Sequence, residues 1–506
     1  MSNQNYISTD NGSPPVGINE IPVLAYDLFY DEVCGMLNNP SNHCLSYYCQ
    51  DLSDRLRFIC CIADDETGRI KVLSHEGNRE GLTLKSLTPA CTSMHIFERE
   101  IHENSGVKFD GHPWLKPVRY PHDRAERLNV MDTYPFYEIE SEELHEVGVG
   151  PVHAGVIEPG HFRFICNGEK VLHLEIQLGY QHRGVENLFT ESRNALQRSI
   201  LAENIAGDTA IGHGLAHAQL IESLAGIEVC DALRIERCIA LEMERIAVHI
   251  GDTAALCGDV AYQLGQVTCE ALRTMVINTT QFWCGNRFGK GLVRPGGSNY
   301  PLTDEIASGL LEVLGDVERR YGNVADCVYS LPSVLGRFED IGTVTRQQAE
   351  GTGAVGMAAR TCGIVRDLRR THPFQYYKNY NIDPVILETG DVLARGMLRA
   401  LEVKASAGII RGLIDSWRKA DKTVGKPDYG YRLRPDSFAV SLTEGWRGEI
   451  CHSAVTDSKG NITHYKVKDP SQHNWMALAL AVRNQEISDF PVCNKSFNLS
   501  YCGHDL

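Results

Sequence analysis

Apolar residues recur at helical spacing along much of this chain. In the stretch 231–255 they fall three or four positions apart, and residues of opposite charge lie three apart, as in Glu242 and Arg245. This period places apolar side chains on one face of a helix and charged ones on the other. The pattern predicts amphipathic helices over five segments: 26–37, 92–103, 231–255, 303–324 and 394–419.

Shorter apolar runs, bounded by turn residues, predict β-strands in three places. Two pairs of runs flank the sequences Asp-Asp-Glu-Thr-Gly and Asn-Gly, and a third pair is followed by Asp-Ser-Lys-Gly. Residues of these types favour the tight turns of hairpins. The runs are 56–63 with 68–74, 162–166 with 171–178, and 437–441 with 448–455.

The order of these elements predicts four parts. Residues 1–20, rich in Asn, Ser, Gly and Pro, read as a flexible tail, and 21–120 as a small α+β domain. The charged stretch 121–146 lacks periodicity and suits a linker, whereas 147–506 is mostly helical with strands at its edges. We therefore predict an α+β protein: a small N-terminal α/β-sandwich-like domain, then a mainly helical domain with small peripheral β-sheets.

Composition narrows the classes of function. The 506 residues carry 49 basic and 65 acidic side chains, so the net charge is 49 − 65 = −16, which disfavours a nucleic-acid-binding face. No run reaches the roughly 18 apolar residues of a spanning helix, and the polar N-terminus lacks the order of a signal peptide. We expect the chain to remain on the cytoplasmic side of the membrane.

Seventeen cysteines show no CxxC spacing, which argues against a zinc or iron–sulfur site in this chain. Most are expected to be reduced core residues. The string Gly-Thr-Gly-Ala-Val-Gly at 351–356 follows no predicted strand, so it is a weak indication of dinucleotide binding.

Histidines are the most informative candidates for chemistry. His153 and His161 lie in a loop dense in Gly and Pro, whereas His213 and His217 are four apart and share one face of a predicted helix. Such a pair can bind a metal, but no third ligand accompanies it, so satisfied polar or core histidines are the favoured interpretation. Glu158, in the same loop between Ile and Pro, suits proton transfer; the alternative is an ion pair with Arg163 on the next strand.

Several motifs then resemble one family. The run Gly-Pro-Val-His-Ala-Gly-Val-Ile-Glu-Pro-Gly-His-Phe-Arg-Phe at 150–164 resembles large subunits of membrane-bound (group 4) nickel–iron hydrogenases. It is equally similar to the quinone-site subunit of respiratory complex I. Residues 97–117 resemble the complex I subunit that packs beside it. Further matching segments follow in family order: 174–186, 241–249, 294–297, 363–370 and 444–449.

The metal-binding motifs depart from the hydrogenase pattern. The hydrogenases bind nickel and iron through four cysteines, and this chain has Ala206, Thr209, Ser471 and Asn474 at those positions. Alanine has no donor atom, and neutral oxygen donors are poor substitutes for thiolates around a soft metal centre. We therefore expect no nickel–iron centre, as in the energy-converting hydrogenase-related complexes that the sequence resembles.

The resemblance also implies roles for individual side chains. Glu158 matches the proton-transfer glutamate of the hydrogenases, and Arg447 matches their active-site arginine. His153 and His161 match the loop that contacts the quinone headgroup in complex I. The family tyrosine falls near His213 or His217, and the sequence leaves open which of the two replaces it.

The function implied is that of a soluble-arm large subunit in a membrane-attached, complex I-like redox complex. Electrons would come from an iron–sulfur cluster in a partner small subunit and pass to a quinone. Integral membrane partners would couple this step to proton or ion translocation, and any NAD-linked activity would belong to another subunit. Two alternatives stay open: a non-catalytic coupling scaffold, and a hydrogenase with an atypical metal site.

Overall fold

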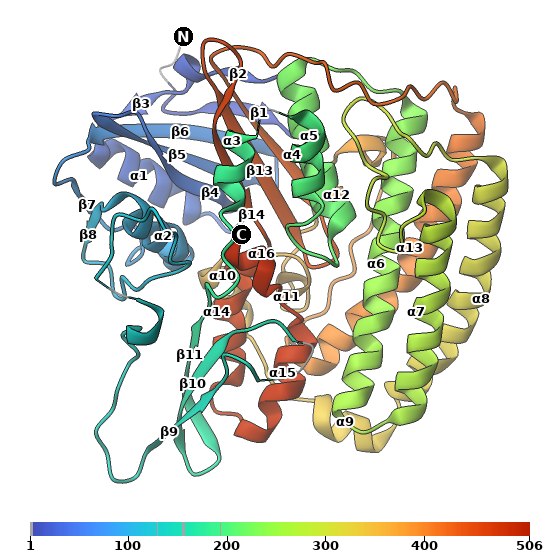
Figure 1. Cartoon of the computed structure of the whole chain (residues 1–506). Coiled ribbons are helices and arrows are strands. Elements are labelled where there is room, and N and C mark those ends of the chain that lie inside the picture. The colour runs from blue at the N-terminus through green and yellow to red at the C-terminus, as the bar shows by residue number, and fades with distance from the viewer. Residues whose placement is uncertain (1–3, 129, 154–156, 193) are drawn as a thin grey trace.

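The computed structural model describes residues 4–128, 130–153, 157–192 and 194–506, and Figure 1 shows their arrangement. Its N-terminal part is built on a five-stranded sheet of order β1-β6-β5-β4, with β3 beside β6. β4 pairs with β5, and β5 pairs with β6, both in antiparallel orientation. In the second pair Phe58 of β5 lies opposite His75 of β6. The strands are β1 (Ile7–Asp10), β3 (Val23–Leu24), β4 (Asn42–Asp51), β5 (Arg55–Asp64) and β6 (Arg69–Asn78).

Both faces of this sheet are buried, which explains why β5 is apolar nearly throughout. Phe58 and Cys60 face the helices α1 (Tyr26–Leu37) and α2 (His95–Ser105). Ile59 and Cys61, one position along, belong to the core of the larger C-terminal part. Alternating side chains of a strand point to opposite faces, so one strand joins two cores.

The prediction of a flexible tail over 1–20 is wrong from residue 7 onward. Ile7–Asp10 pairs with β6, and β2 (Val16–Gly17) pairs with a strand of the C-terminal part. Asn11 donates to the carbonyl oxygens of His372 and Leu442 at 3.0 Å each. These backbone contacts need no apolar side chains, so the hydropathy pattern carries no sign of them.

Residues 121–144 contain one short helix, η3 (Met131–Thr133), and otherwise no regular element among the residues described. A three-stranded antiparallel sheet follows, of order β11-β10-β9. Its strands are β9 (His145–Val149), β10 (His161–Asn167) and β11 (Lys170–Gln177). The loop between β9 and β10 carries the predicted site residues His153 and Glu158.

Four long helices form the largest block, on the right of Figure 1. They are α6 (Asp231–Asp259), α7 (Gln263–Cys284), α8 (Asp304–Val328) and α13 (Val392–Lys419). Beside them, α5 (Ala210–Ala225) packs against a sheet of β12 (Ser437–Glu444), β13 (Glu449–Thr456) and β14 (Ile462–Lys468). The predicted α+β class and all five predicted helices are confirmed, within a few residues at their ends.

Shorter helices complete the chain. Among the residues described, no helix is both long and apolar enough to cross a membrane. The shorter helices that carry or border the site are α3 (Val185–Glu191), α4 (Ala195–Ala202), α14 (Ser471–Val482), α15 (Phe490–Phe497) and α16 (Tyr501–Asp505). The rest are α9 (Pro332–Phe338), α10 (Arg346–Thr352), α11 (Met357–Arg360) and α12 (Leu368–Thr371).

Candidate functional site

The four positions that match metal ligands converge where α5, α14 and the turn after β12 meet. Thr209 precedes α5, and its hydroxyl accepts from the guanidinium of Arg447 at 3.1 Å. Asn474, on the first turn of α14, lines the same small recess as Arg447. Ser471 begins α14, and its hydroxyl oxygen accepts from the backbone N–H of Ser500 at 2.9 Å.

This donor set does not fit a nickel–iron centre. The amide of Asn474 bonds in both directions with the backbone of Val355, at 3.1 Å each. The hydroxyl of Thr209 donates to Asp208 at 3.0 Å, and Ala206 has no donor atom at all. These neutral groups bond to other parts of the chain, and a soft metal centre prefers thiolates. In the described part of the chain, no three His, Cys, Asp or Glu residues are arranged to bind a metal.

Arg447 is held by a bidentate ion pair. Both terminal nitrogens of its guanidinium lie 2.6 Å from carboxylate oxygens of Asp208, and its Nε donates to the carbonyl of Asn498 at 2.6 Å. Burial alone would lower the pKa of Arg447, but Asp208 raises it above its ordinary value. The side chain is therefore a permanent, paired cation beside the four positions that match metal ligands, which are called the former metal position below.

The loop after β9 brings His153 and Glu158 to the C-terminal helix α16. Nε2 of His153 lies 3.5 Å from the hydroxyl of Tyr501, and its ring packs on Phe162 with centroids 5.4 Å apart. The backbone N–H of Cys502 donates to Glu158 at 3.4 Å. Residues 154–156 of the loop lie outside the described part of the chain.

A glycine shapes the start of this loop. Gly150 has a φ of +99°, and a Cβ there would lie 2.1 Å from the carbonyl oxygen of Gly160, so only glycine fits. The alternative ion pair between Glu158 and Arg163 is not formed, because Arg163 pairs with Glu146 at 2.8 Å. Glu158 is therefore free of that strand and lies against α16 instead.

His161, the first residue of β10, lies at the other end of the loop. Its Nδ1 is 3.2 Å from the carbonyl oxygen of Gly150, whereas its buried Nε2 has no partner in the described part of the chain. Partial burial lowers the pKa of both His153 and His161, which favours their neutral forms. A neutral imidazole with one bare nitrogen can accept or donate a proton.

His213 and His217 form part of a buried hydrogen-bonded chain that the sequence did not reveal. Nε2 of His213 lies 3.0 Å from Asp469, and its Nδ1 lies 3.1 Å from Nε2 of His452. The hydroxyl of Tyr465 lies 2.9 Å from Nδ1 of His452 and 2.9 Å from Nδ1 of His217. His452, Tyr465 and Asp469 are more than two hundred positions away, so no local spacing could have indicated them.

One arrangement of protons satisfies every link of this chain. His217 donates to Tyr465, Tyr465 to His452, His452 to His213, and His213 to Asp469. Nε2 of His217 then remains a bare acceptor, and it has no partner in the described part of the chain. The five groups therefore form one oriented line of donors and acceptors in a closed core.

The electrostatics of the line keep His217 and His452 neutral. Burial lowers the pKa of His217 to about 3, with Arg198 and Arg294 adding to the effect. Burial likewise lowers the pKa of His452 well below its usual range. Burial works to raise the pKa of Asp469, but the hydrogen bond from His213 holds it below its ordinary value. The line ends on the carboxylate of Asp469. This residue lies two positions before Ser471, which is one of the four positions that match metal ligands.

The predicted residues thus fall into two groups around one C-terminal segment. His153 and Glu158 contact Tyr501 and Cys502, and Ser500 contacts Ser471. His213 reaches the same region through Asp469, whose carboxylate lies close to Gly503. His153 and His213 are therefore neighbours of one short segment rather than of one another.

Two family models match the chain in the order that the resemblance predicted. The model described as "Respiratory-chain NADH dehydrogenase, 30 Kd subunit" matches residues 29–130. The one described as "Respiratory-chain NADH dehydrogenase, 49 Kd subunit" matches residues 259–434. The first covers β4, β5, β6, α2 and most of α1, and the second covers α7, α8 and α13.

Curated relatives come from both branches of the resemblance. Hydrogenase-4 component G of Escherichia coli is 25% identical over 449 residues, which span 85% of this chain and 77% of that protein. A subunit of the NADH-quinone oxidoreductase of Phocaeicola vulgatus is 24% identical over 459 residues, 83% of this chain and 86% of that protein. Both alignments extend across the N-terminal and C-terminal parts.

A solved structure shares the fold. A chain of the membrane-bound sulfane sulfur reductase, described as an archaeal respiratory membrane complex, superposes with a TM-score of 0.67 at 20% identity. The match covers 73% of this chain and the whole of that one. The predicted resemblance is thus confirmed by sequence families, by curated relatives and by the fold.

Proposed function

We propose a redox role for this chain in a membrane-bound complex, because the models of the 30 kDa and 49 kDa subunits of the respiratory-chain NADH dehydrogenase match it one after the other. It acts there as the large subunit of the peripheral arm, on the cytoplasmic side. Its relatives include subunits of hydrogenases and of NADH-quinone oxidoreductases. Electrons come from an iron–sulfur cluster in a partner small subunit and pass to a quinone-type acceptor.

One observation carries this proposal. At the positions that match metal ligands, the polar side chains form hydrogen bonds within the chain, whereas groups able to move protons lie on both sides of them. A quinone that accepts two electrons also takes up two protons, and a buried site must supply them through side chains. Glu158 and the neutral His161 border the loop side, and the line from Asp469 to His217 lies on the other.

The roles of the side chains follow from their contacts. Glu158 and His153, held against α16, relay protons toward the acceptor. His161 takes up a proton at its unpartnered Nε2 and passes it on, because its Nδ1 already donates to Gly150. The guanidinium of Arg447, held by Asp208, keeps a fixed cation beside this path. Membrane partners then couple the proton movement to ion translocation.

A second candidate is a non-catalytic scaffold that joins a cluster-bearing subunit to the membrane arm. The saturated hydrogen bonds around Arg447 and Asn474 favour it, because they leave no free donor at the former metal position. A hydrogenase with an atypical metal site finds no support in this donor set.

The test uses the intact complex. The partner's cluster is reduced, a short-chain quinone is added, and cluster oxidation is followed by electron paramagnetic resonance. Glu158→Gln and His161→Gln should slow the reaction by about a hundredfold or more, the usual range for loss of a proton-transfer group, with assembly unchanged. Glu146→Gln, on the neighbouring strand β9, is the matched control and should keep the wild-type rate.

Two outcomes would overturn the proposal. No quinone-dependent oxidation in the wild-type complex would favour the scaffold, and wild-type rates in both variants would exclude the proton path. Metal content gives an independent check: iron at cluster stoichiometry without nickel is expected. One nickel per chain would show that the donor set binds a metal after all.

A further inference from the structure

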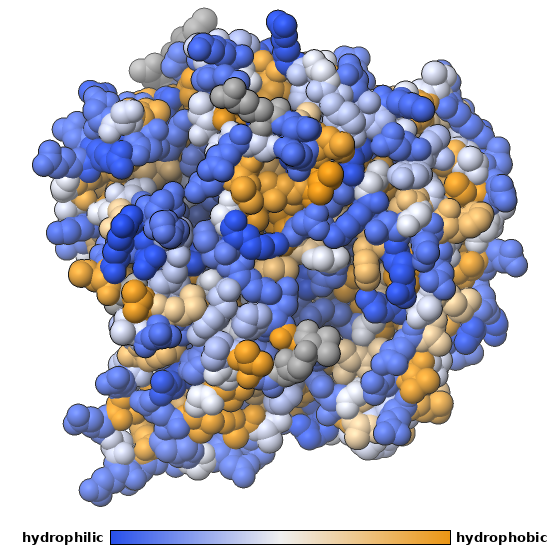
Figure 2. Space-filling model, in the orientation of Figure 1, coloured by the Kyte–Doolittle hydropathy of each residue, from blue (hydrophilic) through white to orange (hydrophobic). Residues whose placement is uncertain are grey.

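Apolar side chains line a cavity of about 720 Å³ between the N-terminal part and α14. On the face shown in Figure 2 the surface is mostly hydrophilic, and its apolar groups lie in separate places, which is normal for a folded protein. The cavity differs, because most of its lining side chains are apolar. None of the four positions that match metal ligands lines it, so it is distinct from the former metal position. A volume of this size is typical of sites that enclose a small molecule.

The wall on α14 is one face of that helix. Met476, Ala479 and Leu480 lie three or four positions apart, and each is only partly buried although the helix packs in the core. Leu172 and Ile176 of β11 are partly buried in the same way and line the same space. Among the lining residues, aliphatic side chains outnumber aromatic rings. The cavity therefore offers an apolar surface for a flexible hydrocarbon chain.

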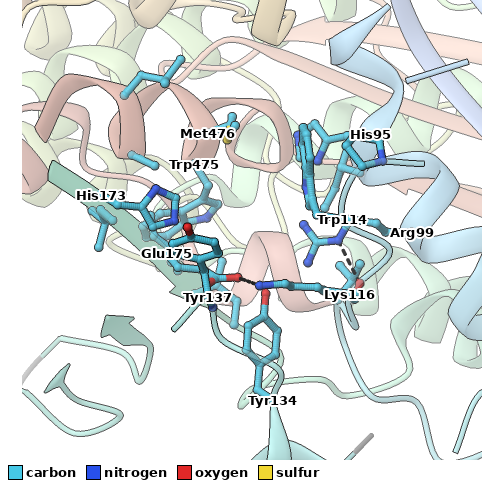
Figure 3. A pocket seen from close by; sticks show the side chains of 18 of the residues that line it. His95, Arg99, Trp114, Lys116, Tyr134, Tyr137, His173, Glu175, Trp475 and Met476 are labelled. Atoms are coloured by element: carbon cyan, nitrogen blue, oxygen red, sulfur yellow. Dashed lines mark hydrogen bonds and ion pairs between the residues drawn. The ribbon is translucent and has the colours of Figure 1, made fainter. Parts of the chain in front are cut away.

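Positive charge is in excess in the wall of this cavity. Three basic side chains line it: Arg99, Lys116 and Arg483. Its one carboxylate, that of Glu175, is neutralised by an ion pair with Lys116 and accepts from the backbone N–H of Tyr137 at 2.8 Å. Figure 3 shows this ion pair near the centre of the view. Arg99 and Arg483 therefore have no counter-charge in the wall, in a chain whose net charge is −16.

Arg483 is the basic group that can meet a ligand. It follows the last turn of α14, its side chain is exposed, and no hydrogen bond or ion pair holds its guanidinium among the residues described. Arg99 differs, because it donates to two backbone carbonyl oxygens at 2.8 and 2.7 Å. Burial lowers the pKa of His173 on β11, Glu175 opposes this, and Arg483 adds to it. The guanidinium of Arg483 therefore lies near that ring, at the opening of the cavity.

We propose that this cavity binds a long-chain carboxylate, with its acyl chain along α14 and β11 and its carboxylate at the opening beside Arg483. The chain leaves water for an apolar wall, whereas the carboxylate stays partly hydrated and keeps its charge. A guanidinium offers a carboxylate two parallel N–H donors, so this end of the ligand has a defined place. The inference goes beyond the proposed function and does not rest on it.

Isothermal titration calorimetry of the purified full-length chain measures binding, with laurate below its micelle-forming concentration as the probe. We expect saturable binding of a single laurate to each chain. The affinities of octanoate, decanoate and laurate should rise about tenfold for each two added CH₂ groups, because every buried CH₂ adds to the gain from leaving water. Unsaturable binding, or equal affinities along this series, would overturn the proposal.

Arg483→Gln tests the contact with the carboxylate. It should weaken decanoate binding by about fivefold or more and leave unchanged the binding of decanol, which has the same chain length and no charge. Arg319→Gln is the matched control, since that arginine is exposed on α8, pairs with Asp316 and lies outside the cavity; it should alter neither affinity. An equal effect of Arg483→Gln on both ligands would contradict the assignment to a carboxylate.

Ala479→Phe tests the site of the chain. The larger side chain occupies part of the cavity and should weaken the binding of both laurate and decanol by about tenfold or more. Ala271→Phe places the same ring on an exposed face of α7 and should leave both affinities unchanged. Circular dichroism confirms that each variant is folded. Full laurate affinity in folded Ala479→Phe would place the ligand elsewhere.

Two further outcomes would assign the cavity to another occupant. Lauroyl-lysophosphatidylglycerol has the same chain with a phosphate head, and tighter binding than that of laurate would assign the site to a membrane phospholipid. Laurate binding by the isolated chain but not by the intact complex would mean that a partner subunit fills the cavity. Either result overturns this proposal and leaves the proposed function standing, because oxidation of the partner's cluster is measured separately.

Discussion

At the residue scale, the most informative feature is the line of side chains from His217 to Asp469. Its members come from α5, β13, β14 and the turn between β14 and α14, and all are buried. Buried imidazoles stay neutral because the low-polarity interior penalises their charged form. The same physics that makes this line a suitable proton path makes the fold sensitive to acid.

His217 gives the sharpest prediction of that sensitivity. Burial lowers its pKa from 6.5 to about 3 in the folded chain. Below pH 6.5 the unfolded chain therefore binds a proton that the folded chain does not. The free energy of unfolding decreases as the pH is lowered, down to about pH 3. Between pH 6.5 and 5 the loss attributable to this residue is about 2 kcal/mol.

His217→Gln should remove that part of the pH dependence, because glutamine can still bond to Tyr465 and does not titrate. Urea unfolding at pH 8, 6.5 and 5 measures the free energy of unfolding of both proteins. The difference between their free energies of unfolding at pH 8 gives the part of the effect that does not depend on pH. An unchanged slope between pH 6.5 and 5 would show that His217 carries a proton in the folded state.

At the scale of elements, periodicity was a good guide where helices are amphipathic. α1 has the predicted bounds, and α6 and α13 differ from prediction by a few residues at one end. The strands β10 and β11 were also predicted, because turn residues separate two apolar runs. What escaped prediction depends on backbone pairing or on distant partners, as with β1 and Tyr465.

The site was predicted only in part for the same reason. The sequence identified His213 and His217 as one face of a helix, and the structure adds the partners that occupy their nitrogens. The cavity of about 720 Å³ beside α14 left no trace in any motif. It is lined by residues of α2, β10, β11, α14 and α16 and of the stretches 113–118 and 134–144, and only folding brings these together.

The contact between α6 and α13 rests on a buried ionic cluster around Glu402. Its carboxylate lies 2.6 Å from Arg360, 2.7 Å from His249 and 3.4 Å from Arg245. Burial alone would raise the pKa of Glu402, but these partners hold it well below its usual range. The cluster stabilises the helix pair only while the negative charge balances the arginines.

Glu402→Gln should therefore destabilise the fold by about 3–5 kcal/mol, because it leaves buried guanidinium groups without their counter-charge. Thermal or urea unfolding at pH 7 measures the change. Glu350→Gln is the control, since its pair with Arg346 at 2.9 Å lies on an exposed helix face, where such pairs contribute less than about 1 kcal/mol. Equal losses of stability in the two variants would mean that the buried cluster contributes no more to stability than an exposed ion pair does.

At the scale of the whole molecule, the N-terminal sheet and the C-terminal part share one core. Ile59 packs in the same cluster as Leu215 of α5, and β2 pairs with β12. Buried ions cross the boundary as well: Glu449 of β13 lies 2.7 Å from His43 of β4. The connection 121–144 contributes little regular structure, so these contacts rather than the linker hold the two parts together.

Glu100 of α2 is the centre of the second ionic contact across this boundary. It accepts from Arg119 at 2.9 Å and from Gln472 of α14 at 3.2 Å, and it forms an ion pair with Lys466 of β14. Burial works to raise the pKa of Glu100, but Arg119 and Lys466 hold it below its ordinary value. The carboxylate is therefore charged at neutral pH and ties two elements of the C-terminal part to the N-terminal one.

We expect the wild-type chain to unfold in one cooperative transition at pH 7, because a shared core leaves neither part stable without the other. Glu100→Gln should destabilise the boundary by about 3–5 kcal/mol and split the calorimetric transition in two. Glu76→Gln, whose pairs with Arg55 and Arg57 at 3.4 Å each lie within the N-terminal sheet, should lower the midpoint without splitting it. Two transitions in the wild type would mean that the parts fold independently. A single transition in Glu100→Gln would mean that the shared apolar core alone couples them.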